Sequence, residues 1–244
     1  MEIVTSIVPQ KSFNNQDRQR LLELYQQYFD NVKPQIFFKD LKEKDWIILI
    51  QNHAGKTLGF STIKLIWLPV NGCEQLFLYS GDTIVKEEAR GYSALSCAFV
   101  KFMFYLINKY SKTLKYWFLI TKGYRTYRFL PLYFKEFFPA YYNTNIPKHY
   151  KNTLNTIGFY KFGNCYNPDN HIIKLKNDKD YLKLPMANVP ESKMNDLHVK
   201  YFLEKNPGYY LGDELACIAE ICESNFKPAV YKVKDIAKVD LSQV

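Results

Sequence analysis

The hydrophobic and polar positions at the start of the chain predict one strand followed by two helices. Residues 2–8, EIVTSIV, are rich in β-branched residues and read as a strand. The apolar positions of residues 17–29 recur at helical spacing, and Asn14 or Asn15 is a suitable N-cap for that helix. A second, short helix is expected over residues 35–43.

Residues 45–85 have the pattern of three consecutive antiparallel strands. Two β-rich runs flank the turn sequence NHAGK, which indicates a hairpin. The dipeptide Asn71-Gly72, a strong turn signal, separates the second run from the third. The three runs therefore predict a β-meander.

A long apolar stretch, residues 91–107, comes next. A membrane-spanning helix needs roughly 20 apolar residues, whereas this stretch is shorter and has Lys101 in its middle. It therefore predicts a helix buried inside the protein. The run KYWFLIT, residues 115–121, then reads as a buried strand. A strand, a helix and a strand in this order predict a right-handed crossover between two parallel strands.

The remainder of the chain predicts further elements without a clear linker between them. Residues 129–142 are too aromatic for a solvated loop and are expected to be core, with a tunnel for an apolar chain or a membrane-touching lid as alternatives. The expected elements are a helix over 148–163, a strand in HIIKL at 171–175, a helix over 192–206, a final helix over 214–224 with Asp213 as N-cap, and an edge strand within 229–239. We expect an α/β core over residues 1–175 and a C-terminal helical elaboration over 176–244, packed on the same domain.

Composition narrows the function classes. The chain of 244 residues carries a formal net charge of +9, which favours an anionic partner such as nucleic acid, an acidic carrier protein or a phosphorylated cofactor. Cys97, Cys217 and Cys222 lie in apolar, helix-like patterns and are expected to be buried. No signal-peptide pattern is visible at MEIVTSIVPQ, so a cytoplasmic location is expected. The spacing of the four histidines predicts no metal site.

Two short motifs carry a resemblance to a known superfamily. The stretch VKEEARGYSA, residues 85–94, resembles the strand end and Arg-Gly pyrophosphate loop of the GNAT superfamily of acyl-CoA-dependent N-acyltransferases. The stretch LNTIGFYKFG resembles the Gly-Phe ending of the family's closing helix, with Gly158 and Phe159 in register. The predicted element order is also that of the family. The resemblance implies a mostly antiparallel sheet with one parallel strand pair and helices on both faces.

The resemblance further implies an enzyme that moves an acyl group, of medium or long chain length among the options, from acyl-CoA or an acyl-carrier protein to an amine. The implied donor site is the loop after the third strand of the meander, in which backbone N–H groups at a helix start hold a phosphate. It comprises Val85, Arg90, Gly91, Tyr92, Ser93 and Ala94. The chain departs from the family at three positions: Ser93 and Leu95 replace loop glycines, and Leu154 stands where the family has a tyrosine proton donor.

Acyl transfer to an amine requires a base, a polarised carbonyl and an acid for the leaving thiolate. Asp82, three residues before Val85, is the best-placed carboxylate for the base. Because the usual tyrosine is absent, tyrosines that follow the parallel strand are candidates for the acid, and we select Tyr127 and Tyr150.

The cluster YRTYR alternates aromatic and cationic side chains. On a helix, Arg125 and Arg128 would share one face and could together hold a carboxylate or phosphate, with Tyr124 beside them in a substrate site. An exposed helix with arginines stacked on tyrosines is the structural alternative.

Two other functions stay open at this point. The interleaved basic and aromatic residues of KYWFLITKGYRTYRF could stack nucleic-acid bases, although no RNP-like, KH-like or zinc pattern accompanies them. The departures at Leu95 and Leu154 are also compatible with a catalytically inactive GNAT-like protein that binds a ligand.

Overall fold

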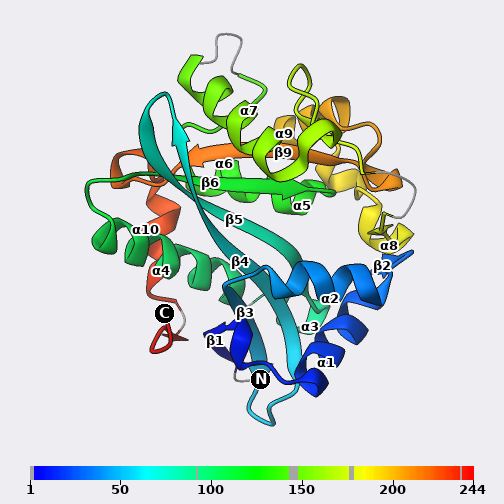
Figure 1. Cartoon of the computed structure of the whole chain (residues 1–244). Coiled ribbons are helices and arrows are strands. Elements are labelled where there is room, and N and C mark those ends of the chain that lie inside the picture. Colours follow the sequence, from blue (N-terminus) through cyan, green and yellow to red (C-terminus); the bar gives the residue numbers. More distant parts are fainter. Residues whose placement is uncertain (1–2, 92, 143–147, 176–178, 237) are drawn as a thin grey trace.

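The computed structural model describes residues 3–91, 93–142, 148–175, 179–236 and 238–244, which form a large mixed sheet covered by helices (Figure 1). The strands of the sheet are β1 (Ile3–Pro9), β3 (Trp46–Asn52), β4 (Thr57–Val70), β5 (Cys73–Val85), β6 (Leu114–Thr121), β7 (Ile172–Ile173), β9 (Glu214–Glu220) and β10 (Val239–Asp240). Their order across the sheet is β10-β1-β3-β4-β5-β6-β9-β7. A separate ribbon pairs β2 (Phe29–Asp30) with β8 (Tyr181–Leu182).

The helices surround this sheet. They are α1 (Asn15–Gln26), α2 (Pro34–Lys42), α3 (Glu87–Arg90), α4 (Ala94–Lys109), α5 (Tyr124–Tyr127), α6 (Phe129–Tyr133), α7 (Lys148–Phe162), α8 (Leu184–Ala187), α9 (Leu197–Lys205) and α10 (Pro228–Lys234). The start of α1 is fixed by a capping box, in which Asn14 accepts from the Asp17 N–H at 2.9 Å and Asp17 accepts from the Asn14 N–H at 3.2 Å.

The predicted meander and crossover are confirmed. β3, β4 and β5 pair antiparallel in sequence order, and β5 pairs parallel with β6 after the crossover through α4. α4 packs with Trp117 and Leu119 of β6 in one hydrophobic cluster, whereas α7 packs with Tyr116 and Phe118 in another. Successive side chains of a strand point to opposite faces, so these helices cover opposite faces of the sheet. The expected fold class, with helices on both faces, is confirmed, but the sheet contains a second parallel pair, β1 with β10, beside the expected pair of β5 and β6.

Two predictions for the C-terminal part are wrong. Residues 214–220, expected to begin the final helix, form β9, which lies in the sheet between β6 and β7. Residues 229–234, expected to be part of an edge strand, lie in α10, and only the short β10 beyond it pairs with β1. β9 is buried on both faces, so its sequence ELACIAE lacks the alternation that distinguishes a half-buried strand from a buried helix. The division of the chain at residue 175 stays a prediction.

Burial confirms most expectations about the core. The aromatic segment 129–142 contributes Tyr133, Phe134, Phe137 and Phe138 to the interior, so its interpretation as core is confirmed. Cys97 and Cys217 are buried, but Cys222 is half-exposed because it follows the end of β9, and that prediction is wrong. Within the described residues, no helix combines the length and apolar character needed to cross a membrane.

Candidate active site

The parallel strands β5 and β6 separate at their C-terminal ends and leave a cavity between them. Their pairing runs from Gln75 opposite Leu114 to Ser80 opposite Leu119 and stops there. The register between β4 and β5 shifts at the same level, where Asp82 has a φ of 46°. This irregularity redirects β5, so that its last residues face a cavity of about 290 Å³ instead of β6. Ligands of α/β sheets bind at this end of parallel strands.

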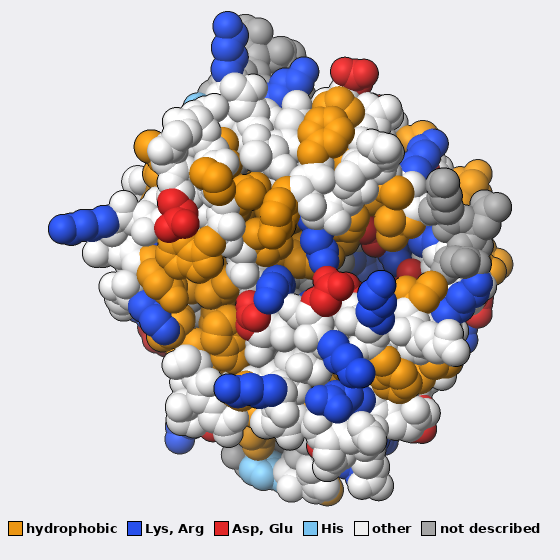
Figure 2. Space-filling model, viewed as in Figure 1, with side chains coloured by type: hydrophobic (Ala, Val, Ile, Leu, Met, Phe, Trp, Pro, Cys, Tyr) orange, Lys and Arg blue, Asp and Glu red, His pale blue; other side chains and the backbone are white. Residues whose placement is uncertain are grey.

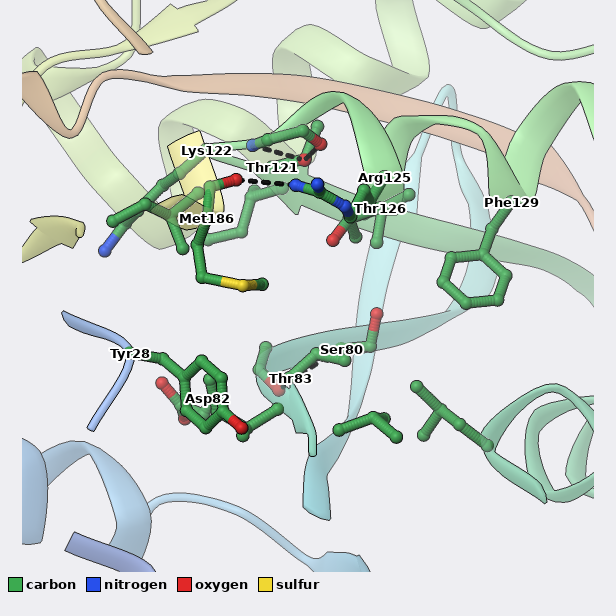
Figure 3. Close-up of a pocket in the computed structure, with 18 of the residues that line it drawn as sticks. Tyr28, Ser80, Asp82, Thr83, Thr121, Lys122, Arg125, Thr126, Phe129 and Met186 are labelled. Carbon is green, nitrogen blue, oxygen red and sulfur yellow. Dashed lines mark hydrogen bonds between the residues drawn. The ribbon is translucent and has the colours of Figure 1, made fainter. Parts of the chain in front are cut away.

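Six parts of the chain line the cavity. They are the end of α1 with β2 (Tyr25, Tyr28, Phe29), the end of β5 (residues 80–85), α3 with the start of α4 (Ala89, Arg90, residues 93–96), the end of β6 with α5 and α6 (residues 119–123, Arg125, Thr126, Phe129), the β8–α8 segment (Leu182, Met186) and the start of β9 (Glu214). Figure 2 shows a hollow surrounded by charged side chains on the face drawn in Figure 1. The close-up in Figure 3 places Tyr28, Asp82 and Thr83 on one side and Lys122, Arg125 and Met186 on the other.

The N-terminus of α4 forms one end of the cavity. Ser93, the N-cap, has a left-handed φ of 51°, and the Cys97 N–H donates to its carbonyl at 2.9 Å. The N–H groups of the first helical turn, from Ala94 onward, precede the first intrahelical bond and have no helical acceptor. Because Ser93, Ala94 and Leu95 line the cavity, these N–H groups and the positive end of the helix dipole lie at a position where an anion can bind.

Arg90 adds a positive charge beside this helix start. Its Nε donates to the Val85 carbonyl at 3.1 Å and its Nη2 lies 3.2 Å from Sδ of Met186, while the side chain borders the cavity. Of the predicted donor residues, Val85, Arg90, Ser93 and Ala94 therefore meet at the cavity. Gly91 does not line it, has a φ of −71° and leaves open space for a Cβ, so no local requirement for glycine exists there. Tyr92 lies outside the described residues.

Asp82 lies in a partly buried network of charges on the α2 side of the cavity, in which its side chain is 19% exposed and that of Lys44 2%. Its Oδ2 accepts from Oγ1 of Thr62 at 3.1 Å and lies 3.7 Å from Nζ of Lys44. Lys44 Nζ is closer to Asp40, at 2.6 Å. Burial raises the pKa of Asp82 from 3.8 to about 7, with Lys44 opposing the rise and the Asp40 carboxyl adding to it. A carboxylate with a pKa near neutrality can accept a proton from an amine and release it again.

The two tyrosines selected from the sequence lie away from the cavity. Tyr127 is completely buried in the α4-side core and donates to the Pro139 carbonyl at 2.9 Å. Tyr150 packs edge-on against Tyr116 and borders a different depression, together with Glu220. Both tyrosines were candidates because they follow β6 in the sequence, but neither is among the residues that line the cavity.

Two other tyrosines line the cavity and were not selected from the sequence. Tyr25 donates to Asp180, and burial raises its pKa well above the ordinary value. Burial also raises the pKa of Tyr28, with Arg90 opposing and Glu88 adding to the rise. Both were interpreted as the apolar face of a helix, and nothing local to that helix indicates that they reach the end of β5.

The predicted pairing of two arginines is wrong. Arg125 lines the cavity, donates to the Met186 carbonyl at 2.6 Å and lies 4.7 Å above the ring of Tyr124, which is buried and does not line the cavity. Arg128 instead forms an ion pair with Asp196 at 3.2 Å. α5 ends at Tyr127, and Arg128 pairs with the residue that caps α9 instead of joining Arg125 at the cavity.

A second charged group that the sequence did not reveal surrounds Lys122. Its Nζ lies 2.6 Å from Oδ1 of Asp180 and 3.4 Å from Oε1 of Glu214. Burial lowers the pKa of Lys122, but Glu214 and Asp180 raise it above the ordinary value overall, so the ammonium stays charged. The described residues contain no group of three or more His, Cys, Asp or Glu arranged to hold a metal ion.

Comparisons with known proteins give matches only among solved structures. No protein-family profile and no curated protein matches the chain. Similar solved structures include a probable N-acyltransferase of unknown function from Enterococcus faecalis (13% identity, TM-score 0.43, 56% of this chain and 33% of that one). A second is N-myristoyltransferase of Saccharomyces cerevisiae with bound myristoyl-CoA (15% identity, TM-score 0.38, 48% of this chain and 31% of that one). A third is a GNAT-family N-acetyltransferase of Escherichia coli in complex with CoA (16% identity, TM-score 0.34, 50% of this chain and 64% of that one).

The matched part thus spans about a third of the first two of these structures. All three TM-scores lie below 0.5, so the fold follows from the chain's own topology and the function from the site itself. The fold is defined by the chain's own topology: a strand and two helices, a three-stranded meander, a crossover helix whose start faces the gap between two parallel strands, and two further antiparallel strands. This is the element order and sheet topology that the resemblance to the GNAT superfamily predicted.

Proposed function

We propose that the protein is an N-acyltransferase that uses acyl-CoA as donor and an amine as acceptor. The observation that carries the proposal is that the N-terminus of α4 and Asp82 line one cavity. A phosphate site and a base with a pKa near 7 are the two requirements that a CoA thioester and an amine place on such a site.

In this proposal the donor enters between β5 and β6. Its pyrophosphate binds the first N–H groups of α4 and the guanidinium of Arg90, and the pantetheine chain lies in the gap beyond Ser80. The acyl group extends toward the apolar part of the lining, which includes Leu119 and Phe129. The thioester carbonyl accepts from a backbone N–H of β5 near Val85, where β5 is no longer paired with β6.

The reaction then needs three proton transfers. Asp82 takes a proton from the acceptor ammonium, and the freed nitrogen lone pair attacks the thioester carbon. The C–N bond forms, the oxyanion collapses, and the C–S bond breaks. Tyr28 gives its proton to the departing thiolate, and the proton lost by the new amide nitrogen returns to Tyr28 through solvent. The raised pKa of Tyr28 keeps its hydroxyl protonated near neutral pH, as a proton donor requires.

A nucleic-acid function has little support in the structure. Five of the six aromatic side chains of KYWFLITKGYRTYRF that were expected to stack bases are buried (Tyr116, Trp117, Phe118, Tyr124 and Tyr127), and the sixth, Phe129, is half-buried and lines the cavity. Base stacking requires exposed ring faces, so this stretch offers no stacking platform.

Thermal unfolding against CoA, acetyl-CoA, octanoyl-CoA and palmitoyl-CoA tests the proposal. A ligand that binds only the native state adds about 2.7 kcal/mol of stability at 100 times its Kd. Stabilisation by every CoA species, with release of free thiol when an amine is added, is the expected result. No stabilisation by any of them would contradict CoA as the donor, and binding without thiol release would support an inactive binding protein.

A further inference from the structure

Arg125 brings a positive charge to the cavity that no acidic side chain of the described residues balances. It is half-buried and lines the cavity, and Figure 3 shows it on the opposite side from Asp82. Its Nη1 donates to the backbone carbonyl of Met186 at 2.6 Å, and a carbonyl is a neutral acceptor. Among the described residues, ion pairs of arginine are formed by Arg20 and Arg128, and not by Arg125.

The guanidinium of Arg125 is held in place from two directions. Its central carbon lies 4.7 Å from the centre of the Tyr124 ring, and the bond to Met186 fixes one edge. A guanidinium has five N–H donors in one plane, so a bond from Nη1 leaves the adjacent donors of Nε and Nη2 for another acceptor. This pair of parallel donors matches the two oxygens of a carboxylate.

The other two cations that line the cavity have different roles. Nζ of Lys122 lies 2.6 Å from Oδ1 of Asp180 and 3.4 Å from Oε1 of Glu214, so two carboxylates already balance this charge. Arg90, beside the start of α4, is the cation that holds the donor phosphates in the proposed function. Of these three cations, Arg125 is therefore the one that remains for an anionic group of the second substrate.

We propose that Arg125 binds a carboxylate of the acceptor, so that the amine to be acylated belongs to an amino acid. This inference rests on the proposed function, in which Asp82 takes a proton from the acceptor ammonium. An amino acid presents an ammonium and a carboxylate at its two ends. Asp82 and Arg125 line one cavity from opposite sides, which is the arrangement that such an acceptor requires.

Acyl transfer to matched pairs of acceptors tests the inference. Each pair contains an amino acid and the amine that has a methyl group in place of the carboxylate: glycine with ethylamine, β-alanine with propylamine, and γ-aminobutyrate with butylamine. At a saturating concentration of one acyl-CoA, we expect the amino acid to have the higher kcat/KM in at least one pair. The expected ratio is about 10- to 100-fold, the range for hydrogen bonds to a charged group. No preference for the amino acid in any pair would overturn the inference.

Arg125→Gln removes the positive charge but keeps an N–H group that can donate to the Met186 carbonyl. In this variant the ratio for the preferred pair should fall toward one. Arg128→Gln is the matched control, because Arg128 pairs with Asp196 outside the cavity, and it should keep the wild-type ratio. If Arg125 only held the α8 segment in place, its loss would affect both members of a pair equally. An unchanged ratio in Arg125→Gln would therefore overturn the inference.

A phosphate of the donor could satisfy the same guanidinium, and the Kd of CoA separates the two sources of the anion. If Arg125 held a donor phosphate, Arg125→Gln would raise the Kd of CoA at least about tenfold, as is expected for the loss of the Arg90 contact. We expect the Kd of CoA to stay near the wild-type value in Arg125→Gln. A tenfold rise would assign Arg125 to the donor site and overturn the inference.

The failures of the two proposals differ. If CoA stabilises the protein and the alkylamines are acylated as fast as the amino acids, the carboxylate site is wrong and the acyltransferase stands. If no CoA species binds or no amine is acylated, the acyltransferase fails, and calorimetric titration with the three amino acids decides the carboxylate site. Heat of binding to the wild type that is lost in Arg125→Gln but kept in Arg128→Gln would support it. Absence of binding to the wild type would overturn it.

Discussion

Oδ2 of Asp82 lies 3.7 Å from Nζ of Lys44, farther than an optimal ion pair, because Lys44 is held closer to Asp40. Lys44 therefore only partly offsets the burial of Asp82, whose pKa is raised to about 7. A base must be deprotonated before it can act. We expect kcat/KM for the acceptor to rise with pH through a limb centred near 7, with little activity below pH 5.

Asp82→Asn tests the assignment of this limb. The amide cannot accept the proton, so the rate should fall by a factor of about 10²–10⁴ and the limb near pH 7 should disappear. CoA binding, measured by thermal unfolding, should persist because the donor phosphates contact Arg90 and the start of α4 in the proposed arrangement, and not Asp82. A variant that retains the limb would show that another group is the base.

The second prediction concerns the pH at which kcat/KM rises, and Asp40→Asn tests it. The Asp40 carboxyl raises the pKa of Asp82 and competes for Lys44. Replacing it by a neutral amide removes the repulsion and frees Lys44 for Asp82, so the pKa of Asp82 should decrease. The acidic limb of kcat/KM should therefore move below pH 7. A shift to higher pH would contradict the network described here.

Arg90→Glu should weaken the binding of CoA. Arg90 is exposed and its main protein contact is the Val85 carbonyl, so the charge reversal should leave folding almost intact. Loss of a phosphate contact and introduction of repulsion predict at least about a tenfold increase in the Kd of CoA. Arg128→Glu is the matched control, because Arg128 pairs with Asp196 outside the cavity. Equal effects of the two variants would indicate a general charge effect and not a phosphate site.

The parts of the site that the sequence revealed are those carried by one continuous segment. Val85, Arg90, Ser93 and Ala94 lie within ten residues, and Asp82 precedes them on the same strand, so local pattern and resemblance were sufficient. The end of β5 and the start of α4 lie together because α4 is the crossover helix between β5 and β6, and the hydrophobic pattern predicted this crossover.

The rest of the site depends on contacts between distant segments. Glu214 reaches the cavity because β9 inserts between β6 and β7, and the sequence of β9 does not distinguish a buried strand from a helix. Asp180 and Tyr25 meet across 155 positions of the chain. Tyr127 and Tyr150 follow β6 in sequence as a ligand-binding residue would, but their side chains point into the cores, which only the packing of α9 and α7 decides.

The last prediction concerns the proton donor and compares two tyrosines, Tyr28 and Tyr150. In Tyr28→Phe the thiolate has no nearby proton donor, so kcat should fall by a factor of about 10²–10⁴ while the Kd of CoA changes little. Tyr150→Phe removes a hydroxyl that contacts the Glu220 backbone away from the cavity. It should cost about 1 kcal/mol in the free energy of unfolding and leave kcat near that of the wild type. Thiol release at saturating donor and acceptor, together with thermal unfolding, measures both effects. The opposite result, with Tyr150→Phe inactive and Tyr28→Phe active, would restore the assignment made from the sequence, and it would require the acyl donor to bind in the depression beside Glu220.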